Sequence, residues 1–181
     1  MDSGVLEFRL LGPLEVRRDG GPVSLTGGKQ RTLLALLLLR ANEVVARDTL
    51  IEELFGGAAS EAAANALQAS VSRLRKLLGA EVISTRPAGY AVVVELEHVD
   101  LFRFEQLAEA GRNELAAGQP ARAATVLREA LALWRGSPLQ DVEGNAVDAE
   151  VRRLEELRLA ARMDLIDADL ALGRGGDLVA S

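Results

Sequence analysis

The stretch NALQASVSRLRKLLG at residues 65–79 has the pattern of an amphipathic helix. Apolar residues recur at the i, i+3, i+4, i+7 spacing of a buried stripe: Ala64, Leu67, Val71, Leu74 and Leu78. The opposite side carries Asn65, Ala69, Ser72, Arg73 and Lys76, with Gln68 and Arg75 at its flanks. No acidic residue stands between positions 62 and 80. The pattern therefore predicts a helix that packs on one side and leaves a basic, polar side free.

The residue types on the polar side match those that bind DNA. Arginine and lysine neutralise phosphates or donate to guanine, while asparagine and glutamine pair with adenine. A basic helix face is also compatible with simple exposure to solvent, so the neighbouring segments must separate the two interpretations.

The segment that follows this helix has the composition of a β-hairpin. Two runs rich in β-branched residues, at residues 83–86 and 90–94, flank a break at Pro87, Ala88 and Gly89. A helix followed by a small ribbon is typical of a winged helix. Arg86 stands just before the turn, where a wing would bring it to a phosphate or the minor groove; its alternative is an exposed strand arginine.

The segments that precede the helix predict a small sheet and two further helices. VLEFRLLG, PLEVRR and DGGPVSL read as three strands, and LTGGKQRTLLALLLLRAN reads as a helix with a long leucine run. A short strand at VVAR leads into a helix at DTLIEELFG, with Asp48 as its expected N-cap. Lys29 or Arg31, near the start of the leucine-rich helix, could touch a DNA phosphate.

This order of elements, with LLGPLEV, KQRTLLALLL, VVARDTLIEELF, SRLRKLL and TRPAGYAV, resembles the OmpR/PhoB-type winged helix. The similarity is strongest to the Streptomyces antibiotic regulatory protein family and extends over essentially the whole chain. The resemblance implies an α+β DNA-binding domain at residues 1–97 that reads directly repeated promoter sites. It places the helix with Ser72, Arg73 and Arg75 in the major groove, Arg75 and Lys76 on phosphates, and Arg86 at the minor groove.

The second half of the chain changes to a purely helical pattern. Two amphipathic segments rich in small residues meet at Gly118-Gln119-Pro120, which predicts an antiparallel pair like a tetratricopeptide unit. A third segment predicts a long helix, a glycine-rich turn near residues 173–176 and the start of another helix. We expect this array to be truncated at its C-terminus, so that it exposes apolar surface or borrows cover from another subunit.

Residues 98–181, including LALWRGSPLQDV, resemble the bacterial transcriptional activation domain of the same family. Trp134 is expected in the core, with a partner-binding anchor as the alternative. His98, the single histidine, is expected at the domain junction or in solvent rather than in catalysis.

Composition limits the other classes of function. The chain has 181 residues, no cysteine and a net charge of −6, and most of the excess acid lies after residue 97. The absence of cysteine, signal peptide and membrane-spanning run leads us to expect a cytoplasmic protein associated with the nucleoid. TGGKQRT lacks the residues of a phosphate loop, and no catalytic, cofactor or metal motif is present, so we expect no enzyme activity.

The resemblance implies a transcriptional activator of secondary-metabolite genes that recruits RNA polymerase with its sigma factor, and the few cations of each subunit lead us to expect a homodimer at least on DNA. Glu52 and Glu53 are candidates for contacting the polymerase. The alternative is a helical-repeat adaptor that binds partner proteins and has little affinity for DNA.

Overall fold

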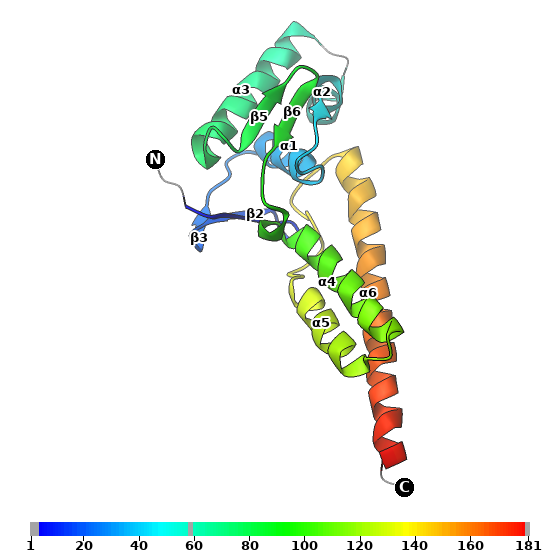
Figure 1. Ribbon diagram of the computed structural model, residues 1–181. Coiled ribbons are helices and arrows are strands. Elements are labelled where there is room, and N and C mark those ends of the chain that lie inside the picture. The colour runs from blue at the N-terminus through cyan, green and yellow to red at the C-terminus, as the bar shows by residue number, and fades with distance from the viewer. Residues whose placement is uncertain (1–3, 58–59, 180–181) are drawn as a thin grey trace.

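The computed structural model describes residues 4–57 and 60–179, with side chains up to residue 173. The chain forms a compact N-terminal half of short helices and two small sheets, and an elongated half of three helices (Figure 1). The predicted winged helix followed by an all-helical half is confirmed.

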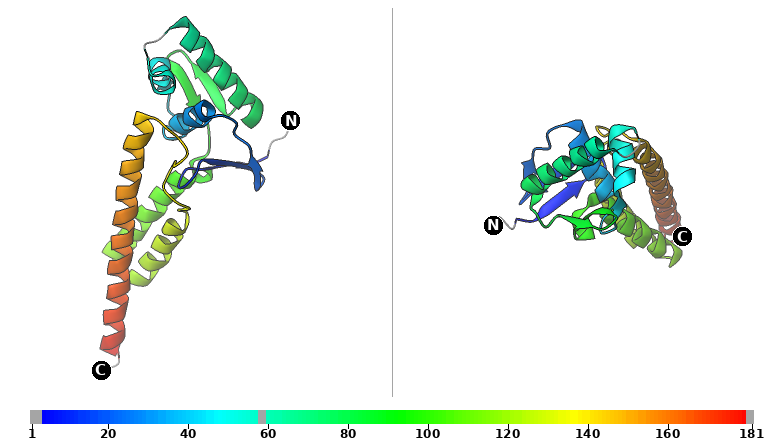
Figure 2. Two further views of the ribbon diagram at one scale, coloured as in Figure 1. Left: turned by 180° about the vertical axis from the view of Figure 1, so that it is seen from behind. Right: turned by 90° about the horizontal axis from the view of Figure 1, so that it is seen from above.

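The first sheet is an antiparallel meander of three short strands. It consists of β1 (Leu6–Arg9), β2 (Glu15–Arg18) and β3 (Gly21–Val23), in that order. Phe8 pairs with Val16, and both side chains are buried, because they lie on the same face of the sheet. This sheet lies between the helices of the winged part and those of the second half (Figure 2).

Three helices form the body of the winged part: α1 (Gly28–Leu38), α2 (Arg47–Phe55) and α3 (Glu61–Leu78). The leucine run of α1 is buried from Thr32 to Leu38, as its apolar composition predicts. The expected N-cap of α2 is wrong by two positions. Ala46 occupies the cap without a side-chain hydrogen bond, and Asp48 lies in the first turn, where its charge still favours the positive end of the helix dipole.

The second sheet contains the predicted hairpin. Strands β5 (Ile83–Arg86) and β6 (Gly89–Val92) pair with each other, and β4 (Val45–Ala46) pairs with β6, which gives the order β4-β6-β5. Gly89 has a steric role, because a Cβ atom at this position would overlap the carbonyl oxygen of Val45. Only glycine allows β4 to approach β6 this closely.

The second half begins with a short 3-10 turn, η1 (Leu96–His98), and continues with α4 (Asp100–Ala116), α5 (Pro120–Ala132) and α6 (Asn145–Val179). The predicted pair joined at Gly118 and Pro120 is confirmed, and Gly111 of α4 packs directly on Leu127 of α5. The predicted glycine-rich turn is wrong, since α6 continues through it to Val179. Glycine weakens a helix by about 1 kcal/mol per residue but does not end it by itself.

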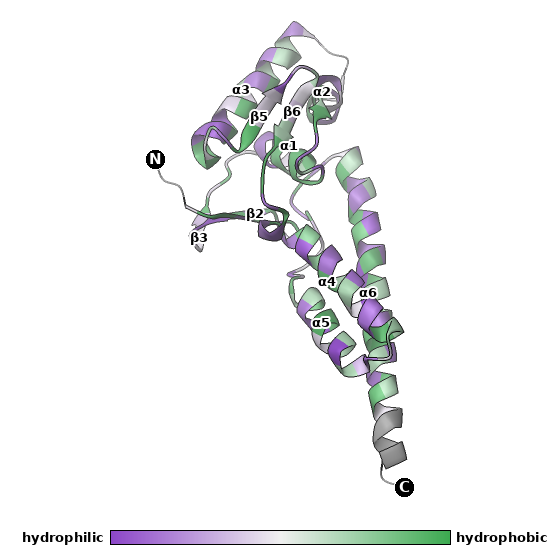
Figure 3. Cartoon of the chain, in the orientation of Figure 1, coloured by the Kyte–Doolittle hydropathy of each residue, from purple (hydrophilic) through white to green (hydrophobic). Residues whose placement is uncertain are grey.

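Polar and apolar residues alternate along the ribbon of α6 (Figure 3), and some of the apolar side chains form an exposed row on one side of the helix. Leu159, Met163 and Ile166 are each 58% exposed and Leu170 is 53% exposed, at the 4-3-4 spacing of one helix face. This row is the apolar surface that the sequence led us to expect either exposed or covered by another subunit. The opposite face of α6 packs on α4 and α5 through Leu154, Ala161 and Ala168.

Candidate nucleic-acid interface

The helix α3 lies at the end of the molecule that is farthest from the C-terminus (Figure 1). Ser60 caps its start by accepting a hydrogen bond from the Ala63 amide at 3.1 Å. Leu67, Val71, Leu74 and Leu78 are buried as predicted, whereas Ala64 is exposed. Ala64 is wrong as a core residue, because burial of this stripe begins only at Leu67, one turn further along α3.

The predicted polar face of α3 is exposed throughout. Its members are Asn65, Gln68, Ala69, Ser72, Arg73 and Lys76. Within the described part of the chain, the polar side chains among them take part in no hydrogen bond or ion pair. Buried Ser70 is different, because its hydroxyl donates to the Ala66 carbonyl at 2.9 Å. We call the six exposed residues the polar face of α3.

Arg75 lies on the flank of this face and has an intramolecular role that the periodicity of the helix did not reveal. Its Nε donates to the Ile83 carbonyl and its Nη2 donates to the Thr85 hydroxyl, both at 2.8 Å. Arg75 is half-buried, while its neighbours Arg73 and Lys76 are exposed. The helix and the wing strand β5 are thus joined by a bidentate arginine.

The tip of the hairpin projects beside α3. Arg86, Pro87 and Ala88 are all exposed, and Arg86 pairs with Gly89 at the end of the ladder. Beneath the tip lies Arg47, whose amide donates to the Ala88 carbonyl at 3.1 Å and whose guanidinium carbon is 5.9 Å from the centre of the Tyr90 ring. Arg47 was not among the residues predicted from the sequence, although it is the single cation of α2.

A groove separates the start of α1 from α3. It is lined by Thr26, Gly27, Gly28, Lys29, Gln30, Phe55, Ala66, Ala69, Ser70 and Arg73. The Lys29 ammonium lies 4.3 Å from the centre of the Phe55 ring, which holds the cation at the groove. The structure therefore brings Lys29 and Arg73 to one surface, although 44 positions separate them in the chain.

Arg31 does not lie on this surface, because its side chain points to the junction between the two halves. Its guanidinium pairs with Asp141 and donates to the Leu14 carbonyl at 2.6 Å. Arg31 comes two residues after Lys29, which corresponds to about 200° around a helix. The two cations therefore face opposite sides of α1, and Arg31 serves the junction between the halves.

Glu52 and Glu53 also differ in their surroundings. Glu52 is exposed, whereas Glu53 is half-buried and accepts a hydrogen bond from the Ala146 amide at 3.2 Å. This amide belongs to the first turn of α6, so Glu53 caps the long helix. Of the two carboxylates, Glu52 is the one left open to a partner.

The junction between the halves is built from the loop after β1 and the segment after α5. Arg135 and Leu139 donate backbone hydrogen bonds to carbonyls of Leu11, Leu10 and Gly12, and Asp141 accepts from the Leu14 amide at 2.8 Å. The two sequence motifs LLGPLEV and LALWRGSPLQDV are therefore contact partners. This direct contact holds the winged part on the helical part.

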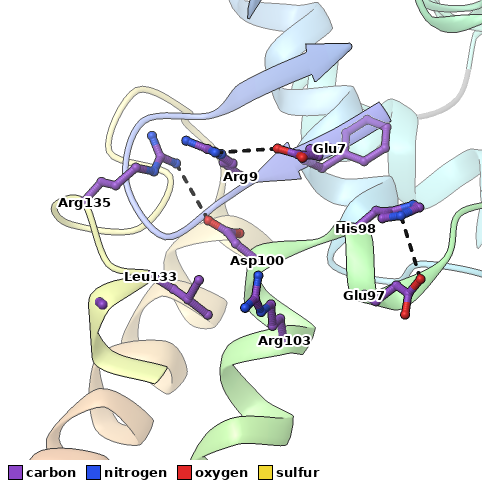
Figure 4. Close-up of a pocket in the computed structure, with 10 residues that line it drawn as sticks. Glu7, Arg9, Glu97, His98, Asp100, Arg103, Leu133 and Arg135 are labelled. Carbon is purple, nitrogen blue, oxygen red and sulfur yellow. Dashed lines mark ion pairs between the residues drawn. The ribbon is translucent and has the colours of Figure 1, made fainter. Parts of the chain in front are cut away.

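Asp100 is a carboxylate of the junction whose side chain is 10% exposed. It accepts hydrogen bonds from the Leu10 amide at 2.6 Å and the Leu11 amide at 3.1 Å, and Arg135 lies 3.8 Å away (Figure 4). Burial raises its pKa from 3.8 to about 6, because desolvation of the charged carboxylate outweighs these favourable contacts. His98 lines the same pocket, so it lies at the junction as expected.

Trp134 belongs to the core, as predicted. It is 8% exposed, its ring meets the Phe104 ring edge-on at 5.1 Å between centres, and the Arg158 guanidinium covers it at 4.5 Å. Across the described residues, no three Asp, Glu or His side chains are grouped as metal ligands would be. None of the described helices is both long and apolar enough to cross a bilayer.

Two family models match separate stretches of the chain. Residues 20–92 match the family model "Transcriptional regulatory protein, C terminal", and residues 99–181 match "Bacterial transcriptional activator domain". Regulatory protein DnrI of Streptomyces peucetius is 34% identical over 96% of this chain and 68% of its own length. The chain belongs to the Streptomyces antibiotic regulatory protein family.

Other members of this group support the same assignment. Transcriptional regulator RedD of Streptomyces coelicolor is 34% identical over 97% of this chain and 52% of its own length. The solved structure of Mycobacterium tuberculosis EmbR in complex with a low affinity phosphopeptide has a TM-score of 0.90 and 34% identity, covering 98% of this chain and 49% of that one. These relatives are named as transcriptional regulators, and this chain is a transcriptional regulator of the same type.

Proposed function

We propose that this regulator binds promoter DNA sequence-specifically, at directly repeated sites, and activates transcription by recruiting RNA polymerase. The observation that carries the proposal is the polar face of α3, which is exposed, free of acidic residues and unpaired within the described chain. An α-helix fits the major groove of B-DNA, and an unpaired face has no internal bonds to break when it binds.

The surroundings of α3 support this mode of binding. Exposed Ala69 and Ala66 let the helix backbone approach the base edges closely, so that Asn65, Gln68 and Arg73 reach them. Lys76 and Lys29 lie at the sides of the same surface and contact phosphates, and Arg86 at the wing tip reaches the adjacent minor groove.

The remaining parts of the proposal concern what happens on the promoter. Two copies occupy the two repeats, because few cations of each subunit face the DNA and a single site would be held weakly. Residues 1–97 act as the DNA-binding domain and residues 98–181 as the activation domain. Exposed Glu52 contacts the polymerase holoenzyme with its sigma factor. The regulated genes belong to secondary metabolism. The protein works in the cytoplasm, on the nucleoid.

Selection from a random pool of DNA duplexes, followed by mobility-shift titration of the selected duplex at two salt concentrations, tests the proposal. We expect a directly repeated consensus and an affinity that falls steeply with salt. Arg73→Ala should weaken binding and make the salt dependence shallower by about one unit in the log–log slope. Arg122→Ala is the matched control, since Arg122 is exposed on α5, far from α3. Selection without enrichment, or binding that ignores salt, would refute DNA recognition by this surface.

The row of exposed apolar side chains on α6 favours a second candidate function, that of a protein-binding adaptor. An adaptor would bind partners through Leu159, Met163 and Ile166 and would lack specific affinity for DNA. The same selection experiment separates the two functions, because an adaptor enriches no duplex sequence.

A further inference from the structure

Arg75 differs from the other cations of α3 because its guanidinium N–H groups form hydrogen bonds within the protein. Its Nε and Nη2 bind the Ile83 carbonyl and the Thr85 hydroxyl, each at 2.8 Å, while Arg73 and Lys76 point into solvent. Two donors of one planar guanidinium, bound to two alternate residues of the same strand, fix both the distance and the angle between helix and strand.

The strand held in this way leads directly to the wing tip. Ile83 begins β5, Thr85 is two residues further, and Arg86 follows immediately. Thr85 pairs with Tyr90 and Arg86 pairs with Gly89, so a shift of Thr85 is transmitted to the tip through the ladder. On its other side the hairpin is held by β4, through the close approach of Gly89 to Val45.

The wing is held from two sides, and only one side leads to α3; the other is formed by β4 and the residues next to it. The attachment to β4 is made of backbone atoms and does not depend on α3. Among the described residues, α3 and β5 are joined by the loop of residues 79–82, by apolar packing of buried Ile83, and by the two Arg75 side-chain hydrogen bonds. Loss of these bonds leaves the hairpin formed but free to change its angle to the helix.

We propose that Arg75 is a positioning residue that sets the wing relative to α3, so that Arg86 and the polar face of α3 engage neighbouring grooves together. This inference rests on the proposed DNA binding. It replaces the expectation that Arg75 contacts a phosphate, because a guanidinium already bound to β5 would have to give up these bonds to reach the DNA.

Two variants separate positioning from direct contact. Arg75→Met keeps the apolar stem of the side chain and removes its charge and donors. Thr85→Val removes the hydroxyl acceptor and leaves the charge of Arg75 in place. If Arg75 acts by position, both variants weaken binding to the selected duplex, by about 3- to 10-fold for Arg75→Met, and neither changes the salt slope once Arg86 has been replaced by alanine. Thr85→Val should give a smaller loss, since the bond to Ile83 remains.

The affinity that the wing contributes is a second measurement, and a general loss of stability would not change it. Arg86→Ala should cost much less affinity in the Arg75→Met background than in the unmodified protein, because an unaligned wing no longer reaches its groove. Protection of the minor groove from hydroxyl radicals beside the repeat should fade in Arg75→Met and persist in Arg73→Ala. Circular dichroism and thermal unfolding of each variant establish that the fold is retained.

The possible outcomes distinguish this inference from the proposed function. Failure of the unmodified protein to bind any selected duplex would refute the proposed function. If the unmodified protein binds, a salt slope that Arg75→Met makes shallower by about one unit in the Arg86→Ala background, together with a neutral Thr85→Val, would show that Arg75 is a phosphate contact and would overturn the inference.

Discussion

The carboxylate of Asp100 accepts the backbone N–H of Leu10 at 2.6 Å, across 90 positions of the chain. Leu10 belongs to the loop that follows the first strand, and Asp100 begins α4, so this bond joins the winged part to the helical part. A second amide, that of Leu11, binds the other carboxylate oxygen at 3.1 Å. The two parts of the regulator are thus connected by a partly buried acidic group and not only by the chain itself.

The raised pKa of Asp100 gives the stability of the protein a specific dependence on pH. The folded state holds this proton up to about pH 6, while the unfolded chain releases it near pH 3.8. The unfolded state therefore gains relative stability as the pH rises through this window, by about 3 kcal/mol at most. We expect the free energy of unfolding of Asp100→Asn, relative to the unmodified protein, to rise by about 2–3 kcal/mol between pH 4 and pH 7.

Urea titrations at a series of pH values measure this difference. The Glu129→Gln variant is a suitable control, because Glu129 is an exposed carboxylate paired with Arg103. Curves that run parallel for Asp100→Asn and the unmodified protein would show that Asp100 does not titrate in this range.

We expect substitution of Lys29 to weaken DNA binding and substitution of Arg31 to lower stability. Lys29→Ala removes a cation from the groove beside α3, so we expect weaker binding and a shallower salt dependence. Arg31→Ala breaks the ion pair with Asp141 and the bond to the Leu14 carbonyl, so we expect lower stability by about 1–3 kcal/mol and an unchanged salt slope. Mobility-shift titrations and thermal unfolding of both variants check this, and an exchange of the two effects would contradict it.

Gly89 should tolerate no side chain. In Gly89→Ala the new Cβ would overlap the Val45 carbonyl, and both partners of the clash are backbone atoms. We expect a loss of about 2 kcal/mol or more in the free energy of unfolding, because β4 must separate from β6. Gly28→Ala is the control, since nothing lies within 4 Å of a Cβ at that position. Equal stability of the two variants in urea would show that β4 can move away at little cost.

Substitutions on the two faces of α6 should differ in how strongly they change the free energy of unfolding. Leu154 is fully buried against the helical core, so Leu154→Ala should lower the free energy of unfolding by about 2–5 kcal/mol. Ile166 is 58% exposed, and Ile166→Gln should change it by less than about 0.5 kcal/mol in dilute protein. Urea unfolding at low concentration measures both values. A large loss for Ile166→Gln would indicate that the exposed row is covered in solution.

Local patterns were sufficient to predict most of the elements. The periodicity of α3 predicted four of its buried residues, and the Pro87-Ala88-Gly89 break predicted the hairpin, because these features depend on neighbours a few residues apart. The sequence predicted a turn near residues 173–176, whereas α6 continues through them. This prediction was wrong because glycine occurs both at helix ends and inside helices.

The sequence by itself determined which side of each helix is apolar and which residues of α3 could meet DNA, because side-chain direction follows from a fixed rotation per residue. Only the tertiary structure decided that Arg75 binds the wing, that Arg31 and Glu53 serve the junction, and that Lys29 joins Arg73 at one groove. Those roles depend on partners that lie 8 to 110 positions away. The spacing of residues along a helix specifies the direction of each side chain, but it does not specify which distant group that side chain contacts.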